Sequence, residues 1–129
     1  TGSMLHLVKP LGFDMDDAKL RRAGLDYHDL AHVMVHESLD DALAQVPGRV
    51  WALTGHASAM YSDVSYADGD GLLFGRESVG LSEEAMSHPR VEKRIRIHMR
   101  EGVRSLNLAN SASIVLYEAW RQLGFPGGV

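Results

Sequence analysis

The sequence predicts one α/β domain whose sheet is largely parallel. Two nearly continuous apolar runs, residues 49–54 and 71–75, are flanked by glycines and are typical of strands covered on both faces. Segments with helical caps and spacing separate the strand-like runs, which is typical of parallel sheets. The chain has 129 residues, 45% of them hydrophobic, which fits a single compact domain.

The first two elements are predicted from alternation and from charge order. Residues 4–10, MLHLVKP, alternate in polarity and end at a proline, which predicts a strand. Residues 14–24 predict a helix because Asp14 can cap its start, acidic residues occupy its first turn, and two arginines and a glycine close it.

Three further elements and the last helix follow from similar signals. Residues 32–37 predict a strand, and residues 38–46 predict a helix that Ser38 caps and a Pro-Gly pair ends. Residues 94–99 alternate strictly, which predicts a strand with one polar face. The last helix carries one apolar stripe, formed by Leu108, Ala112, Val115, Ala119 and Leu123.

The last helix begins in a stretch that is polar well beyond a single cap. Small polar residues usually cost stability inside a helix and favour its ends. Here they are Ser105, Asn107, Asn110, Ser111 and Ser113. We interpret this pattern as a need for close packing and for exposed polar groups at the start of the helix.

Composition excludes several classes of protein. The chain has no cysteine, which excludes disulfides and thiolate chemistry. No apolar run approaches the roughly 20 residues of a membrane span, and no signal segment opens the chain, so we expect a cytoplasmic protein. The net charge of −4 does not suit non-specific coating of nucleic acid, yet residues 90–104 hold six basic against two acidic residues and could bind a polyanion.

Two metal-site interpretations fail on their spacing. His28, His32 and His36 would share one face of a helix, but the β-rich HVMVH segment between them disfavours helix, so we expect no zinc site. A calcium loop counted from Asp68 would need a carboxylate at its twelfth position, where Val79 stands.

The ligand site is expected at the carboxyl ends of the strands. In open parallel sheets ligands collect there, which here means the loops after Thr54, Gly75 and Met99. Gly75 and Gly80 flank Glu77, so the backbone can approach a ligand closely, although a tight turn would explain the same glycines.

These segments, in this order, resemble the SPOUT superfamily of RNA methyltransferases. FGRESVGL resembles its second motif, and IRIHMREGVRSLNLANSASIVLYEAW resembles its third. More narrowly, three segments are similar to the TrmL (YibK-like) group: LHLVKPLGF, KLRRAGLDYHDL and YEAWRQLGF. The resemblance covers residues 5–125.

The resemblance implies a fold and an activity. The fold would be a SPOUT-type α/β domain with a deep trefoil knot at its C-terminal end. The activity would be methylation by S-adenosylmethionine of the ribose 2′-hydroxyl of the wobble nucleotide, cytidine or uridine, in tRNA. The alternatives are a ribosomal RNA 2′-O-methyltransferase of the same superfamily and a non-catalytic knotted dimer that binds RNA or ligand.

The resemblance also implies that the domain, residues 1–129, is incomplete at its N-terminus. The family's first motif, with an arginine implicated beside the 2′-hydroxyl, belongs to a strand and helix that would precede Leu5. We expect this strand and helix to be missing from the sequence. Glu77 and Asn107 match the acid and the asparagine of the second and third motifs and are the candidate catalytic residues.

The cofactor would be held largely by backbone, with no metal. The positions that match its three loops are Leu53, Thr54, Gly75, Ile97, Met99, Ser105 and Leu106. Two residues depart from the family pattern: Val79 replaces a residue that is often basic or polar, and His98 replaces a common proline.

The expected partners are the anticodon stem-loop of tRNA and a second copy of the chain. The candidate RNA-binding residues are Arg21, Arg22, Tyr27, His28, Arg100 and Arg104. The basic residues at 19–22 are equally well explained as the end of a helix, and Tyr27 as interface packing. Tyr117 and Trp120 are expected at the homodimer interface, where aromatic residues are enriched.

Overall fold

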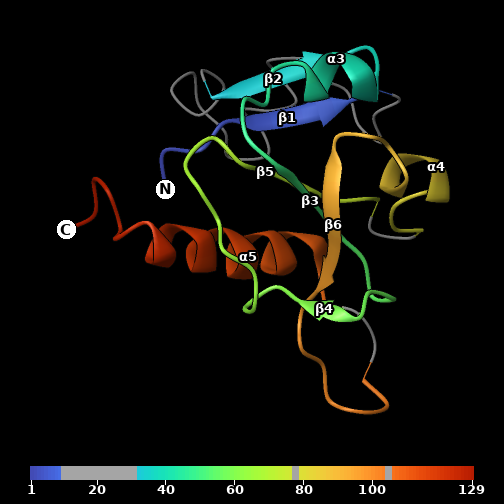
Figure 1. Ribbon diagram of the computed structural model, residues 1–129, viewed down its shortest axis with the longest axis vertical. Coiled ribbons are helices and arrows are strands. Elements are labelled where there is room, and N and C mark those ends of the chain that lie inside the picture. Colours follow the sequence, from blue (N-terminus) through green and yellow to red (C-terminus); the bar gives the residue numbers. More distant parts are fainter. Residues whose placement is uncertain (10–31, 77–78, 104–105) are drawn as a thin grey trace, which may run out of the picture. The chain divides into compact units, whose positions relative to one another are not determined.

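The computed structural model describes residues 1–9, 32–76, 79–103 and 106–129, which form two compact units (Figure 1). One unit comprises residues 2–45, and the other comprises residue 1 with residues 46–129. The helix predicted for residues 14–24 lies outside the described residues.

The N-terminal unit holds two parallel strands and one short helix. Strand β1 (Leu5–Val8) pairs with β2 (Val33–His36), and both lie within segments predicted to be strands. Helix α3 (Leu39–Leu43) packs against both strands and buries Ala42 and Leu43.

Helix α3 begins as predicted and ends earlier than predicted. Ser38 caps it by accepting the N–H of Asp41 at 3.1 Å. The helix does not reach Val46, because a residue before proline is disfavoured in helical conformation. The N–H of Gln45 instead bonds to the carbonyl three residues back, at 3.0 Å, which is the tighter bond of a closing helical turn.

The C-terminal unit contains a four-stranded sheet in the order β4-β6-β3-β5, in which every strand pairing is parallel. Its strands are β3 (Val50–Leu53), β4 (Ala59–Met60), β5 (Gly71–Leu73) and β6 (Val91–Arg96). The predicted parallel α/β architecture is therefore confirmed.

Two features of this sheet differ from the prediction. Strand β6 begins three residues before the predicted start at Arg94 and ends three before Met99, because Val91 and Lys93 pair with β3. Strand β4 was not predicted, since two residues are too few to show alternation.

One face of this sheet is covered by helix α5 (Leu108–Gln122) (Figure 1). The core between them contains Trp51, Tyr66, Ile95 and Val115, and Ile95 and Val115 are fully buried. A second helix, α4 (Glu83–Met86), is capped by Ser82, which accepts the N–H of Ala85 at 3.1 Å.

Helix α5 contains most of the predicted apolar stripe. Asn107 caps its start, and Gly124, with φ +87°, follows its end. Val115 is buried and Ala119 packs against the core. Leu123 is exposed instead of continuing the stripe, because it lies just past the last helical residue. No helix within the described ranges is long and apolar enough to cross a membrane.

Candidate functional site

The carboxyl ends of the parallel strands mark one edge of the C-terminal sheet. Strand β3 ends at Leu53, β5 at Leu73 and β6 at Arg96. The N–H of Thr54 donates to the carbonyl of Ile95 at 3.0 Å, which extends the pairing of β3 and β6 to this edge. The loops that the sequence indicated as a ligand site therefore leave the sheet along a common edge, which we call the carboxyl edge.

The expected cofactor residues at the carboxyl edge are largely anchored by the core. Leu53 and Ile97 both pack against the core cluster, and Met99 is half-buried. The Oγ1 of Thr54 accepts the N–H of His56 at 3.4 Å in the turn after β3. Among the other expected residues, Leu106 is 37% exposed.

Gly75 is packed so closely that no side chain fits there. A Cβ at this position would overlap the backbone of Gly80 and Leu81. The chain returns because the N–H of Gly80 donates to the carbonyl of Arg76 at 2.7 Å, and Gly80 adopts φ +69°. A tight turn after β5 thus explains both glycines, and it brings backbone groups together at the carboxyl edge.

Asn107 has a clear structural role at the start of α5. Its Oδ1 accepts the N–H of Ala109 at 2.9 Å and that of Asn110 at 3.3 Å. Farther along, the hydroxyl of Ser113 donates to the carbonyl of Ala109 at 2.8 Å. Part of the polar stretch therefore satisfies the helix backbone, and a catalytic role for Asn107 stays a prediction.

His98 contacts a loop that the sequence did not connect with the site. Its ring meets the ring of Tyr61 edge-on, with centroids 5.8 Å apart. The N–H of Tyr61 donates to the carbonyl of Arg96 at 2.8 Å, and its carbonyl accepts the hydroxyl of Tyr66 at 2.5 Å. His98, one of the two residues that depart from the pattern of the resemblance, thus makes an aromatic contact with the loop after β4.

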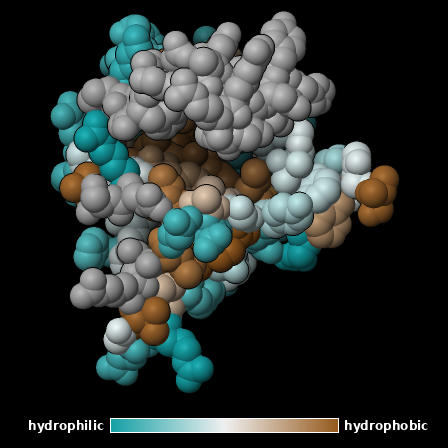
Figure 2. Space-filling model, turned by 180° about the vertical axis from the view of Figure 1, so that it is seen from behind, coloured by the Kyte–Doolittle hydropathy of each residue, from teal (hydrophilic) through white to brown (hydrophobic). Residues whose placement is uncertain are grey.

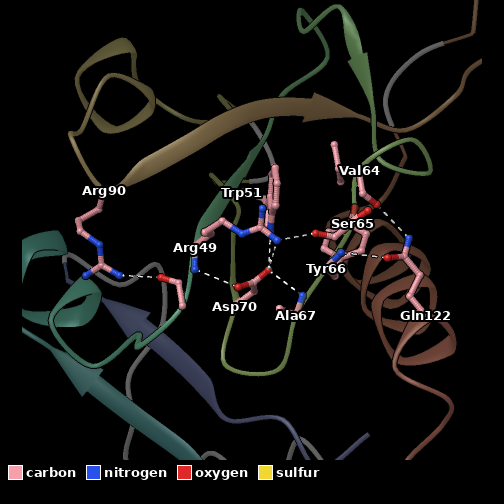
Figure 3. Close-up of polar contacts among 10 residues, drawn as sticks. Arg49, Trp51, Val64, Ser65, Tyr66, Ala67, Asp70, Arg90 and Gln122 are labelled. Atoms are coloured by element: carbon pink, nitrogen blue, oxygen red, sulfur yellow. Dashed lines mark hydrogen bonds and ion pairs between the residues drawn. The ribbon is translucent and has the colours of Figure 1, made fainter.

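A buried carboxylate organises the opposite, amino edge of the sheet (Figure 3). Asp70 is 6% exposed and accepts the indole N–H of Trp51 at 3.0 Å, the N–H of Ala67 at 2.9 Å and that of Arg49 at 2.9 Å. Burial alone would raise the pKa of Asp70, but the hydrogen bonds from Trp51, Ala67 and Arg49 and the Arg49 charge hold it below its usual range. The sequence missed this role because DGDG is typical of a turn.

Hydrogen bonds join the C-terminal end of α5 to the loop that follows β4. Gln122 accepts the N–H of Tyr66 at 2.9 Å and donates to the carbonyl of Val64 at 3.0 Å (Figure 3). Its amide also donates to Glu118 at 2.9 Å. Burial, together with the charge of Glu118, raises the pKa of the Tyr66 hydroxyl, which therefore stays protonated and donating.

The basic region at residues 90–104 is partly used inside the protein. Arg90 donates to the carbonyls of Val46 and Gly48 at 2.7 and 2.9 Å. Arg94 forms an ion pair with Glu83 at 2.7 Å. The positive surface is therefore smaller than the sequence suggested, although Arg100 is exposed as expected.

Two of the three spaced histidines, His32 and His36, lie at or in a strand and not in a helix. His32 and His36 flank or lie in strand β2, and His36 contacts His6, with Nδ1 of His6 2.8 Å from Nε2 of His36. In the described part of the chain no three metal-binding side chains gather, and the expectation of no metal site stays a prediction. The other expected site residues lie outside the described residues: Arg21, Arg22, Tyr27, His28, Glu77, Arg104 and Ser105.

Hydrophobic side chains also reach the surface. Figure 2 shows brown, hydrophobic atoms gathered in the middle of one face.

A separate cluster of aromatic side chains lies on and after α5. Tyr117 is 55% exposed, and its ring lies edge-on to Trp120 at 5.4 Å between centroids. Trp120 in turn contacts Phe125 and donates its indole N–H to the carbonyl of Pro126 at 3.0 Å.

Comparison with known proteins gives concordant matches over most of the chain. Residues 1–117 match the SpoU rRNA Methylase family. A tRNA (cytidine(34)-2′-O)-methyltransferase of Methylovorus glucosotrophus is 49% identical over 130 residues, spanning 100% of this chain and 84% of the relative. The Escherichia coli K12 protein of the same name is 48% identical over 130 residues, spanning 100% and 83%. A solved structure from work on 2-OH methylation of C/U34 on tRNA has a TM-score of 0.82 and 41% identity, covering 95% of this chain and 80% of the other.

Proposed function

The chain belongs to the SpoU rRNA methylase family, and on this premise we propose that it is an S-adenosylmethionine-dependent tRNA methyltransferase. Its target would be the ribose 2′-hydroxyl of the wobble nucleotide, cytidine or uridine. The observation that carries this proposal is identity of 49% and 48%, over the whole chain, to two proteins named for 2′-O-methylation of cytidine 34.

The carboxyl edge fits a cofactor that is held by main-chain groups. The tight turn at Gly75 brings backbone atoms without covering side chains to this edge. Leu53 and Ile97 supply apolar side chains beside it. Main-chain N–H and C=O groups in apolar surroundings can recognise an adenine. We propose that S-adenosylmethionine is held by Leu53, Thr54, Gly75, Ile97, Met99, Ser105 and Leu106.

The protein's chemical task in this reaction is mainly positioning. When bound, S-adenosylmethionine supplies a methyl group activated by its sulfonium. An oxygen–carbon bond forms as the sulfur–carbon bond breaks, so the chain must hold the 2′-hydroxyl in line with that bond. The hydroxyl proton needs an acceptor. Of the two candidates, Glu77 carries a basic carboxylate, whereas the amide of Asn107 can only orient a hydroxyl.

The RNA would be positioned by phosphate contacts and by stacking. Arg100 is exposed, and we propose that it acts with Arg21, Arg22 and Arg104 on phosphates of the anticodon stem-loop. Tyr27 and His28 are available to contact a splayed base. Because the substrate is tRNA, we place the reaction in the cytoplasm.

We further propose one SPOUT domain over residues 1–129, with a C-terminal trefoil knot, that works as a homodimer. The close backbone packing at Gly75 and the capped polar start of α5 support the threaded arrangement. The exposed Tyr117 and its neighbour Trp120 support the dimer, since aromatic side chains are enriched at subunit interfaces.

The test is methyl transfer to tRNA by the full-length protein. Bulk tRNA from an Escherichia coli strain that lacks its own tRNA (cytidine(34)-2′-O)-methyltransferase is incubated with labelled S-adenosylmethionine. We expect label at the ribose of nucleotide 34, located by nuclease mapping and mass spectrometry, and little label in tRNA from the parent strain. Transfer to ribosomal RNA alone would favour the alternative enzyme, and cofactor binding without transfer would favour a non-catalytic dimer.

A further inference from the structure

Arg96 is an unusual residue at the carboxyl edge. It is the last residue of β6 and stands between the fully buried Ile95 and the core-packed Ile97. Its Nε is buried and has no hydrogen-bond partner, and no other side-chain nitrogen or oxygen of the described residues is in this state. Such orphaned donors are rare in folded proteins and call for a physical explanation.

The guanidinium groups of the neighbouring Arg90 and Arg94 both have partners within the protein. Arg90 donates to two backbone carbonyls, and Arg94 pairs with Glu83 and also donates to Ser87 at 3.0 Å. Arg96 forms no ion pair with any described residue. Since arginine stays charged in proteins, a buried Nε–H without an acceptor is unfavourable.

The Arg96 residue is only half-buried. Of its three side-chain nitrogens, only Nε is both buried and without a partner. The planar fork of a guanidinium matches the oxygens of a phosphate or a carboxylate. The part of the Arg96 side chain that is not buried is therefore suited to bind an oxyanion.

We propose that Arg96 binds a phosphate of the substrate RNA beside the reaction site. This inference rests on the function proposed above and adds a residue to its RNA contacts. One observation favours phosphate over the carboxylate of the cofactor, which offers the same oxyanion chemistry. Arg100, four residues on, adds a second positive charge that is exposed. This spread of charge fits a polyanion better than one carboxylate.

The test compares Arg96→Gln with Lys93→Gln, a matched control that removes one positive charge from the same strand. Affinity for tRNA from the methyltransferase-deficient strain is measured across a salt series. Arg96→Gln is expected to weaken binding about tenfold and to lower the slope of log affinity against log salt by about one. Lys93→Gln is expected to change neither by a comparable amount.

A structural role for Arg96 predicts different results. Removing an unpaired charge should leave the thermal midpoint unchanged or raise it, whereas loss of a hidden structural contact would lower it. The inference is overturned if Arg96→Gln binds tRNA like wild type, if it weakens only cofactor affinity by calorimetry, or if it dissociates the dimer in sedimentation. Should that variant not fold, Arg96→Lys keeps the charge but not the fork and is expected to bind tRNA several-fold more weakly; unchanged affinity would overturn the inference.

The outcome for Arg96 can be separated from that for the proposed function. If wild-type protein methylates nucleotide 34 while Arg96→Gln behaves like wild type, only the inference about Arg96 fails. If wild-type protein neither binds nor methylates tRNA, the proposed function fails first.

Discussion

Trp51 of β3 donates its indole N–H to the carboxylate of Asp70, just before β5, at 3.0 Å. The same carboxylate accepts two backbone N–H groups and lies within 3.8 Å of the Arg49 guanidinium. A single buried side chain thus accepts hydrogen bonds from β3, from the residue before β3 and from the loop that leads to β5.

Asp70→Ala is expected to destabilise the protein by about 3 kcal/mol, because it leaves the indole N–H of the buried Trp51 and two backbone N–H groups without their acceptor. Urea unfolding followed by tryptophan fluorescence measures this, since Trp51 loses its partner directly. Asp68→Ala, an exposed change in the same loop, should shift stability by less than about 0.5 kcal/mol. Equal effects of the two changes would show that the Asp70 network contributes nothing.

Gly75→Ala is expected to weaken the binding of S-adenosylmethionine at least tenfold, because a methyl group cannot fit against Gly80 and Leu81 and the turn must open. Isothermal calorimetry with S-adenosylmethionine or its demethylated product measures the change. Gly55→Ala is the control: Gly55 also follows a strand at the carboxyl edge, but nothing lies within 4 Å of a Cβ there. Wild-type affinity in Gly75→Ala would remove this turn from the cofactor site.

Asn107→Ala is expected to cost about 1 kcal/mol of stability, because it removes the acceptor for two N–H groups at the start of α5. Asn107→Asp keeps an acceptor and places a negative charge at the helix N-terminus, so it should be as stable as wild type. Methyl-transfer rates of the two variants then separate capping from chemistry. A stable Asn107→Asp protein with full activity would argue against a catalytic role for the amide.

Stability should fall as the pH drops below about 6.5, through His6. Burial lowers the pKa of His6 from its ordinary value of 6.5, and the nearby His36 lowers it further. Between 6.5 and that lowered value the unfolded chain binds more protons at this site than the folded chain, so acid favours unfolding there. The contribution of His6 is therefore present above pH 6.5 and is lost below it.

Thermal midpoints measured from pH 7.5 to pH 5 test this effect. His6→Gln should flatten the pH dependence, whereas His56→Gln, a change at an exposed histidine, should leave it as in wild type. A pH profile that is the same in His6→Gln and wild type would contradict the assignment.

If the protein forms the proposed homodimer, Tyr117→Arg is expected to shift it toward monomer, because the change places a charge in the proposed interface beside Trp120. Sedimentation velocity over a concentration series measures the shift. Glu92→Arg, an exposed change on β6, reverses a charge elsewhere and should leave the association unchanged. An unaltered dimer in Tyr117→Arg would move the interface away from this part of α5.

Features that depend on neighbours in the sequence could be predicted from the sequence. Alternation indicated β1, a β-rich segment indicated β2, apolar runs indicated β3 and β5, and Ser38 marked the start of α3. Parallel strands share a carboxyl edge, so the pattern also indicated the loops after Thr54, Gly75 and Met99 as a ligand site.

What the tertiary structure decided is which distant groups meet. The strand order β4-β6-β3-β5 cannot be read from periodicity along the chain, and β4 is too short to show alternation. The sequence did not distinguish the six basic residues of the stretch 90–104. In the structure, Arg94 forms an ion pair with Glu83, and Arg90 donates to backbone carbonyls. The Nε of Arg96 is buried and has no partner. Local periodicity reports which face of an element is buried, whereas the partner of a buried charge comes from another segment, and only packing brings the two together.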